Sequence, residues 1–119
     1  MKIRAISIDD DPVAIMMVKK LCETVPQIEL VNTYNDPISG AAGIILDSPD
    51  LLFLDIEMPE FDGVKIMETL VKPPKIIVIS SNESYRNKAL ELNALAFLKK
   101  PVKVEDFQEA ITTYVKSET

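Results

Sequence analysis

The sequence predicts a doubly wound α/β domain in which helices cover both faces of a five-stranded parallel sheet. Strand-like and helix-like segments alternate along all 119 residues, which is the pattern of repeated βα units. Two strand candidates, Leu51–Leu54 and Lys75–Ile79, are almost continuously apolar, as expected of strands covered on both faces. No linker-like stretch interrupts residues 1–119, so we expect a single domain.

The individual elements follow from local patterns. Five strands are expected, at Lys2–Ile8, Ile28–Thr33, Leu51–Leu54, Lys75–Ile79 and Ala94–Leu98. Five helices are expected, at Pro12–Thr24, Pro37–Asp47, Gly63–Val71, Ser84–Leu92 and Val104–Lys116. Asp-Pro pairs mark the starts of the first two helices, because Asp is a good N-cap and Pro fits the first helical position. In such folds ligands bind beyond the carboxyl ends of the strands.

Composition excludes several functions. The 13 basic and 19 acidic residues give a net charge of −6, which disfavours nucleic-acid binding by this domain. No apolar run is long enough to span a bilayer, and the N-terminus does not have the pattern of a signal peptide. Cys22 is the single cysteine, so no internal disulfide is possible. A cytoplasmic location is the simplest expectation.

The chain contains no histidine. Catalysis by Ser-His-Asp or Cys-His groups is therefore excluded, as are histidine general acids and ordinary zinc enzymes. Any chemistry must come from carboxylates, hydroxyls, lysine or arginine, or from a hard cation held by oxygen ligands.

Polar side chains follow four of the five expected strands. The first strand ends in Asp9-Asp10-Asp11, the third in Asp55 and the fourth in Ser80, and Lys100-Pro101 closely follows the fifth. Carboxylates gathered at one edge repel each other, and oxygen ligands favour Mg²⁺. A carboxylate beside Mg²⁺ can attack a phosphoryl group and form an acyl phosphate, whose charge Mg²⁺ and a lysine neutralise. The sequence therefore indicates a phosphoryl-accepting site.

Each residue also has a simpler structural interpretation. For Asp11, beside Pro12, capping of the following helix is favoured over metal binding. Asp55 is different, because a carboxylate that closes a fully apolar strand is a poor choice for packing alone. Ser80 taken alone would be a loop residue. Lys99 competes with Lys100, and the following proline favours Lys100.

With these pieces in order, the chain resembles the receiver domains of bacterial two-component response regulators over nearly its whole length. The matching segments are Ile6–Pro12 (ISIDDDP), Leu51–Pro59 (LLFLDIEMP), Asp62-Gly63, Ile77–Ser80 (IVIS) and Phe97–Pro101 (FLKKP). The resemblance implies a flavodoxin-like fold with strand order 2-1-3-4-5. The opening Ile3-Arg4-Ala5 and the Asp11-Pro12 pair are most similar to receivers attached to LytTR-type DNA-binding domains.

The resemblance also implies roles in phosphoryl acceptance. Asp55 would accept the phosphoryl group from a sensor histidine kinase or a phosphotransfer protein. Asp10 and Asp55 would ligate Mg²⁺, Asp9 would do so directly or through water, and the backbone carbonyl of Glu57 would complete the protein ligands.

Further roles concern switching. Ser80 would be the switch hydroxyl, Phe97 the switch aromatic and Lys100 the ion-pair partner of the phosphoryl group. Phe97 replaces the commoner tyrosine and has no hydroxyl to donate. Glu57 and Asn82 occupy the positions that tune dephosphorylation. The Lys100-Pro101 bond is expected to be cis.

The leading functional prediction is a non-enzymatic signalling switch. Its output surface would be the fourth helix, fifth strand and fifth helix, through which a homodimer could form. Two alternatives remain open: a Mg²⁺-dependent phosphatase that turns over an aspartyl phosphate, and a pseudo-receiver that dimerises without accepting phosphate. The Asp-Asp-Asp-Pro order and the absence of a cap domain disfavour the phosphatase.

Overall fold

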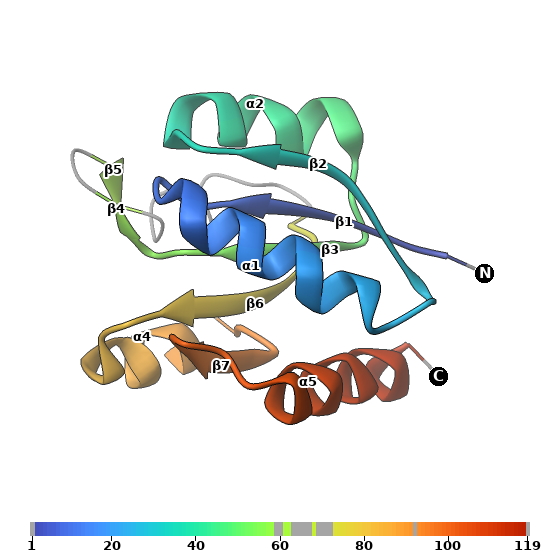
Figure 1. The fold of residues 1–119 in the computed structure, drawn as a ribbon. Helices are drawn as coiled ribbons and strands as arrows, with labels where there is room; N and C mark the ends of the chain where they lie inside the picture. Colours follow the sequence, from blue (N-terminus) through green and yellow to red (C-terminus); the bar gives the residue numbers. More distant parts are fainter. Residues whose placement is uncertain (1, 59–60, 63–67, 69–72, 92, 119) are drawn as a thin grey trace.

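The computed structural model has a five-stranded, all-parallel sheet between two layers of helices (Figure 1). It describes residues 2–58, 61–62, 68, 73–91 and 93–118. The strand order is β2-β1-β3-β6-β7, with bounds β1 Ile3–Ile8, β2 Ile28–Tyr34, β3 Leu51–Leu54, β6 Lys75–Ser80 and β7 Ala96–Lys99. Counting only these five strands, the order is 2-1-3-4-5, so the predicted fold class is confirmed.

Helices cover both faces of the sheet. The described helices are α1 (Pro12–Glu23), α2 (Pro37–Asp47), α4 (Arg86–Glu91) and α5 (Val104–Ser117). One apolar cluster contains residues of α1 and α5, and another on the opposite face contains residues of α2 and α4. The helix predicted at 63–71 lies outside the described residues, apart from Glu68, which is helical.

The core depends on β3, whose four residues are at most 1% exposed. Complete burial of such a side chain stabilises the fold by about 1.5–3 kcal/mol. On the α1–α5 face, Phe53 stacks on Phe107 of α5 with ring centroids 5.4 Å apart. This burial on both faces explains the unbroken apolar sequence that precedes Asp55.

Aspartate caps start α1 and α2, as predicted. Asp11 Oδ1 accepts a hydrogen bond from the Val13 backbone N–H at 3.0 Å. Asp36 Oδ1 accepts from the N–H groups of Ile38 and Ser39, both at 3.0 Å. Each cap satisfies helix donors that have no partner within the helix and leaves proline at the first helical positions.

Two local features differ from the sequence prediction. A short antiparallel hairpin, β4 (Glu57–Met58) with β5 (Phe61–Asp62), follows β3 where no strand was expected. The helix predicted at 84–92 begins instead with a 3₁₀ turn at Glu83–Tyr85, before α4. The Asn82 side chain caps this turn by accepting from the Ser84 N–H at 3.0 Å.

Candidate functional site: an acidic cluster beside a half-buried lysine

Two buried carboxylates lie next to each other at the carboxyl ends of β1 and β3. Ile8 and Leu54 are partners in the parallel register, so the residues that follow them are neighbours. The Asp55 N–H donates to the Ile8 carbonyl at 3.0 Å, which continues the ladder by one bond. Asp9 is 3% exposed and Asp55 is 6% exposed. Carboxylates this buried require a compensating partner.

Lys100 is that partner. Its Nζ lies 2.9 Å from Asp9 Oδ2 and 3.4 Å from Asp55 Oδ2. The Lys100 N–H donates to the Ser80 carbonyl at 2.9 Å, which fixes the loop that follows β7. The Lys100-Pro101 peptide is cis, as predicted. The structure therefore brings Lys100 to the two carboxylates, while the neighbouring Lys99 is exposed.

The ionisation of Asp55 is opposed by its surroundings. Burial raises the pKa of Asp55 to about 6, and the negative charge of Asp9 adds to this effect. The Glu57 N–H, which donates to Asp55 Oδ1 at 2.9 Å, and Lys100 act in the opposite direction. For Lys100, burial would lower the pKa, but the hydrogen bond to Asp9 and the charges of Asp55 and Asp9 raise it overall. Lys100 therefore stays a cation.

Asp10 completes a group of three carboxylates that fits a divalent cation. Asp9, Asp10 and Asp55 each offer one oxygen, and these oxygens lie within 4.8 Å of one another. Two ligands on opposite sides of a Mg²⁺ ion are about 4.2 Å apart, because each Mg–O bond is about 2.1 Å long. Asp10 is the exposed member of the group, and Asp9 and Asp55 are buried. The donor set therefore suits a hard cation that also binds water and phosphate oxygens.

The Asp9 carboxylate has a second contact that also orders the loop. Its Oδ1 accepts from the Asp11 N–H at 2.9 Å, while its Oδ2 contacts Lys100. Asp11 itself caps α1 through its side chain. The acidic triplet thus divides into a buried residue, an exposed potential ligand and a helix cap. The cap at Asp11 was predicted from the sequence, and the metal-binding roles of Asp9 and Asp10 stay predictions.

Ser80 lies at the end of β6 and is fully buried. Its Oγ accepts from the Asn82 N–H at 3.1 Å, so the hydroxyl is tied to its own loop. Glu57 contacts Asp55 through its backbone N–H, which donates a hydrogen bond to Asp55 Oδ1. Its carbonyl as a metal ligand stays a prediction, as do the tuning roles of Glu57 and Asn82.

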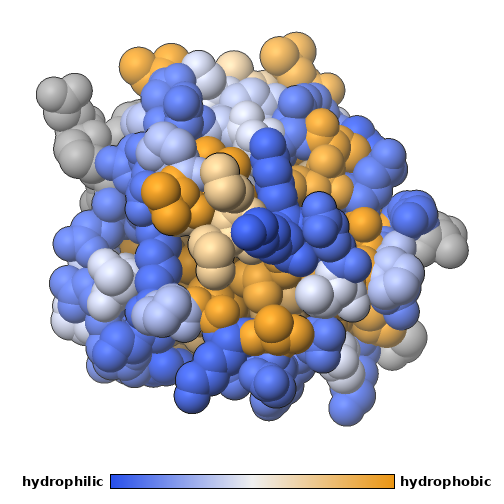
Figure 2. Space-filling model, in the orientation of Figure 1, coloured by the Kyte–Doolittle hydropathy of each residue, from blue (hydrophilic) through white to orange (hydrophobic). Residues whose placement is uncertain are grey.

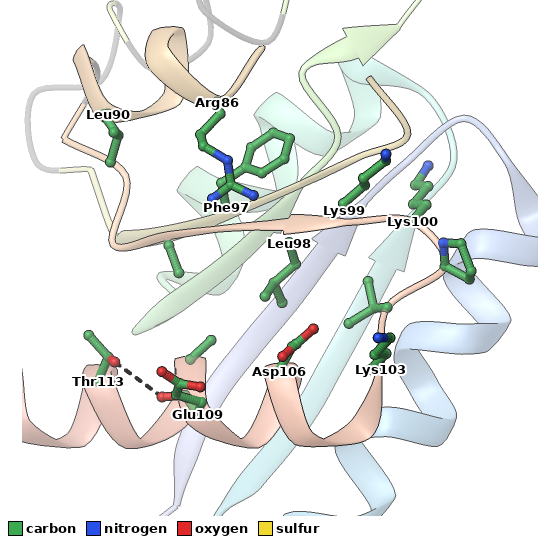
Figure 3. A pocket seen from close by; sticks show the side chains of 14 residues that line it. Arg86, Leu90, Phe97, Leu98, Lys99, Lys100, Lys103, Asp106, Glu109 and Thr113 are labelled. Carbon is green, nitrogen blue, oxygen red and sulfur yellow. Dashed lines mark hydrogen bonds between the residues drawn. The ribbon is translucent and has the colours of Figure 1, made fainter. Parts of the chain in front are cut away.

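Phe97 on β7 is buried in the cluster on the α2–α4 face. Figure 3 shows the Arg86 side chain lying against its ring, with Leu90 nearby on α4. Arg86 Cζ is 4.8 Å from the ring centroid, a distance typical of cation–π contacts. These residues line a groove bordered by α4, β7 and α5. The sequence interpretation missed Arg86, which has no distinguishing motif.

The described part of the chain contains no helix that is both long and apolar enough to cross a membrane.

Comparison with known proteins identifies similar chains. A family model described as the response regulator receiver domain matches residues 5–112. A Geobacter sulfurreducens protein named protein-glutamate methylesterase/protein-glutamine glutaminase 3 is 37% identical over 106 residues, covering 86% of this chain and 29% of the relative. A Hydrogenovibrio crunogenus protein-glutamate methylesterase/protein-glutamine glutaminase is 31% identical over 127 residues, covering 98% and 34%. The chain thus spans about a third of these relatives.

Solved structures show the same fold. The response regulator domain of Thermotoga maritima CheB has a TM-score of 0.78 and 26% identity, and the match covers 98% of this chain and 93% of that one. The isolated receiver domain of RcsB from Salmonella enterica serovar Typhimurium has a TM-score of 0.87 and 19% identity, covering 98% and 90%. At this lower identity the second match supports the fold alone.

Proposed function

The chain belongs to the family of response regulator receiver domains, and from that premise we propose that it accepts a phosphoryl group on Asp55. The observation that carries the proposal is the arrangement of Asp55 beside Asp9, with Lys100 Nζ within 3.4 Å of both. A structural ion pair needs only one carboxylate for one lysine. A second buried carboxylate, with a raised pKa and an exposed third one nearby, suits a site that binds a cation and then an additional anionic group.

In the proposed reaction, an oxygen of Asp55 attacks the phosphorus of a phosphohistidine on a sensor histidine kinase or phosphotransfer protein. The new O–P bond forms as the N–P bond breaks, and the imidazole nitrogen keeps the electron pair and takes up a proton. The donor histidine would come from outside these 119 residues, which contain none. Asp55 Oδ2 is the better candidate for the attacking atom, because Oδ1 is held by the Glu57 N–H at 2.9 Å.

Mg²⁺, held by Asp9, Asp10, Asp55 and the Glu57 carbonyl, would neutralise charge on the transferring group. Lys100 contributes a second positive charge beside the same carboxylates. It is held more closely by Asp9 (2.9 Å) than by Asp55 (3.4 Å), so its contact with Asp55 is the weaker one. After transfer, Lys100 would move from the Asp55 carboxylate to a phosphoryl oxygen.

The proposed switch starts at Ser80. A phosphoryl oxygen would draw the Ser80 hydroxyl away from the Asn82 N–H, to which it is now bound at 3.1 Å. Asn82 caps the turn leading into α4, so the change would be transmitted to that helix. Phe97, packed under Arg86 on the same side, would follow. The surface formed by α4, β7 and α5 would then present a different face to partners.

Output functions are proposed more broadly. The relatives named as methylesterases are about three times as long as this chain. We therefore propose only that phosphorylation of Asp55 controls an effector, either attached to this domain or separate from it. The LytTR-type output and the homodimer through α4, β7 and α5 stay predictions.

Intact-mass spectrometry tests the proposed function. We expect the wild-type protein, incubated with a small phosphodonor such as acetyl phosphate and Mg²⁺, to gain a single phosphoryl group. Asp55→Asn should gain none, and Asp10→Asn or chelation of Mg²⁺ should strongly reduce the yield. An unmodified wild type under all conditions would instead support the pseudo-receiver alternative.

A further inference from the structure

Helix α4 is held to the rest of the domain by little apolar burial. Among its described residues, Arg86–Glu91, only Ala89 is buried. Figure 2 shows mainly hydrophilic residues at the lower left of the molecule, where Figure 1 places this helix. An element with so little buried apolar surface is among the first to open or shift locally. Its other contacts with the sheet therefore contribute strongly to fixing its position.

Arg86, the first residue of α4, makes two contacts at the same time. Its Nε donates to Glu83 Oε1 at 2.6 Å, and its Cζ lies 4.8 Å from the centroid of the Phe97 ring. A guanidinium group is planar, so its edge can hold a carboxylate while its flat face lies against an aromatic ring (Figure 3). A lysine ammonium group lacks this flat face.

The same helix contains an ordinary exposed ion pair with which Arg86 can be compared. Lys88 Nζ lies 3.9 Å from Glu91 Oε2, and the Lys88 side chain is 48% exposed against 47% for Arg86. Such pairs contribute little to stability. Arg86 differs because Glu83 precedes the helix and Phe97 lies on β7. Arg86 thus joins two other parts of the fold, whereas Lys88 pairs within its own helix.

A short chain of hydrogen bonds leads from Ser80 to this ion pair through residues 80–82, the Ser80 loop. The Asn82 N–H donates to Ser80 Oγ at 3.1 Å. The Asn82 side chain accepts from the Ser84 N–H at 3.0 Å and from the Ser84 hydroxyl at 2.7 Å, which caps the following 3₁₀ turn. Glu83 is the first residue of that turn, so a shift of the loop also moves the carboxylate that holds the guanidinium group.

Phe97 has no polar group through which it could bond to the Ser80 loop. In the parallel register it lies opposite Val78, two residues before Ser80. Tyr85 of the 3₁₀ turn packs against the apolar cluster that contains Phe97, but apolar contacts are not directional. The ion pair and the ring contact of Arg86 fix a direction as well as a distance. Arg86 is therefore the residue best placed to connect the ring to the loop.

We propose that Arg86 is a positioning residue that couples the Ser80 loop to Phe97, an inference that rests on the proposed function only for what moves the loop. While Ser80 holds the Asn82 N–H, Glu83 keeps the guanidinium group over the buried ring. When the hydroxyl is drawn away, the turn carries Glu83 and Arg86 with it, and the cover over Phe97 shifts. Arg86 and Phe97 both line the groove bordered by α4, β7 and α5, so the groove changes shape as well.

Fluorine NMR of the full chain, labelled with fluorophenylalanine, tests this coupling without a phosphoryl group. Phe97→Leu identifies the Phe97 signal among those of the 4 phenylalanines. Ser80→Ala removes the acceptor of the Asn82 N–H and should move the Phe97 signal. With Arg86→Gln in the background, the same change should move the signal at least about twofold less, since a cation–π contact at an exposed site alters populations about two- to fivefold.

Two further variants separate this role from a general effect of charge. Lys88→Gln removes a cation of equal exposure from the same helix, so Ser80→Ala should then move the Phe97 signal by the wild-type amount. Arg86→Lys keeps the charge without the flat face and should resemble Arg86→Gln more than wild type. Equal responses with and without Arg86, or no response to Ser80→Ala in either background, would overturn the proposal.

A phosphoryl mimic distinguishes failure of the coupling from failure of the proposed function. Beryllofluoride with Mg²⁺ should shift the Asn82 and Ser84 amide signals in wild type and in Arg86→Gln, but should move the Phe97 signal at least about twofold less in Arg86→Gln. Loss of the amide shifts in Arg86→Gln would overturn the proposal, because Arg86 would then act on the phosphoryl site itself. If beryllofluoride and acetyl phosphate leave the wild type unchanged, the proposed function fails, and the response to Ser80→Ala still decides the coupling.

Discussion

Replacing Asp55 with asparagine should stabilise the metal-free protein, although it removes the residue on which the proposed function depends. Asparagine keeps an oxygen that can accept from the Glu57 N–H, but it carries no charge into the buried site. The negative charge of Asp9 would then have Lys100 as its partner without competition, at the 2.9 Å contact already present.

The magnitude follows from the pKa of Asp55, which burial raises from 3.8 to about 6. A group whose folded pKa is raised contributes its stability below the unfolded pKa and loses it as the pH rises through the folded pKa. At pH 7 the ionised wild type has lost about 3 kcal/mol relative to a neutral side chain. At pH 4, close to the unfolded pKa, the loss is less than about 1 kcal/mol.

Urea denaturation in the presence of a chelator measures this difference. We expect Asp55→Asn to raise the free energy of unfolding by about 2–3 kcal/mol at pH 7 and by less than about 1 kcal/mol at pH 4. Asp10→Asn, which removes an exposed carboxylate of the same cluster, is the control and should stay within about 0.5 kcal/mol of wild type. Saturating Mg²⁺ should narrow the gap, because it stabilises the wild type by mass action.

A variant equal to or less stable than wild type at pH 7 would refute this reasoning. A stabilisation that is the same at pH 4 and pH 7 would also refute it, because the effect could not then come from the ionisation of Asp55.

Four further predictions concern other residues. Lys100→Met should lower the free energy of unfolding at pH 7 by about 3 kcal/mol, because two buried carboxylates lose their cation; a loss below about 1 kcal/mol in urea denaturation would contradict this. Gly43→Ala should destabilise by about 1–3 kcal/mol through the collision with Tyr34, and higher stability in urea, as helix propensity alone gives, would disprove the close packing. Asp11→Ala should cost about 1 kcal/mol through loss of the α1 cap, and an unchanged urea midpoint would exclude that role. Burial, with a smaller contribution from Glu23, raises the pKa of the Cys22 thiol to about 12, so disulfide exchange with Ellman's reagent at pH 8 should be at least about a hundredfold slower than in urea; comparable rates would show that the thiol is accessible.

The fold was predictable because its signals are local. Continuous apolar runs identified β3 and β6, and Asp-Pro pairs identified the starts of α1 and α2. The β4–β5 hairpin could not be predicted in this way, because strands of two residues are too short to show a period. The 3₁₀ turn before α4 depends on the Asn82 cap, whose geometry the sequence pattern does not specify.

The sequence was enough to predict which residues lie near one another at the candidate site, but not the contacts that their side chains make. The carboxyl ends of parallel strands meet at one edge, so Asp9, Asp55 and Lys100 were expected to be neighbours. That Lys100 binds Asp9 more closely than Asp55 depends on side-chain geometry. The sequence also could not predict which side of α2 is exposed, because apolar residues on both sides of a helix do not indicate which side is buried.

The central claim is that Asp55 itself carries the phosphoryl group, and reductive trapping tests it most directly. Borohydride converts an aspartyl phosphate to homoserine, which tandem mass spectrometry of a proteolytic digest can assign to a single residue. After incubation with acetyl phosphate and Mg²⁺, the proposal predicts homoserine at position 55 and unmodified side chains at Asp9 and Asp10. Homoserine at Asp9 or Asp10 with an intact Asp55, or no homoserine in a protein that binds Mg²⁺, would contradict it.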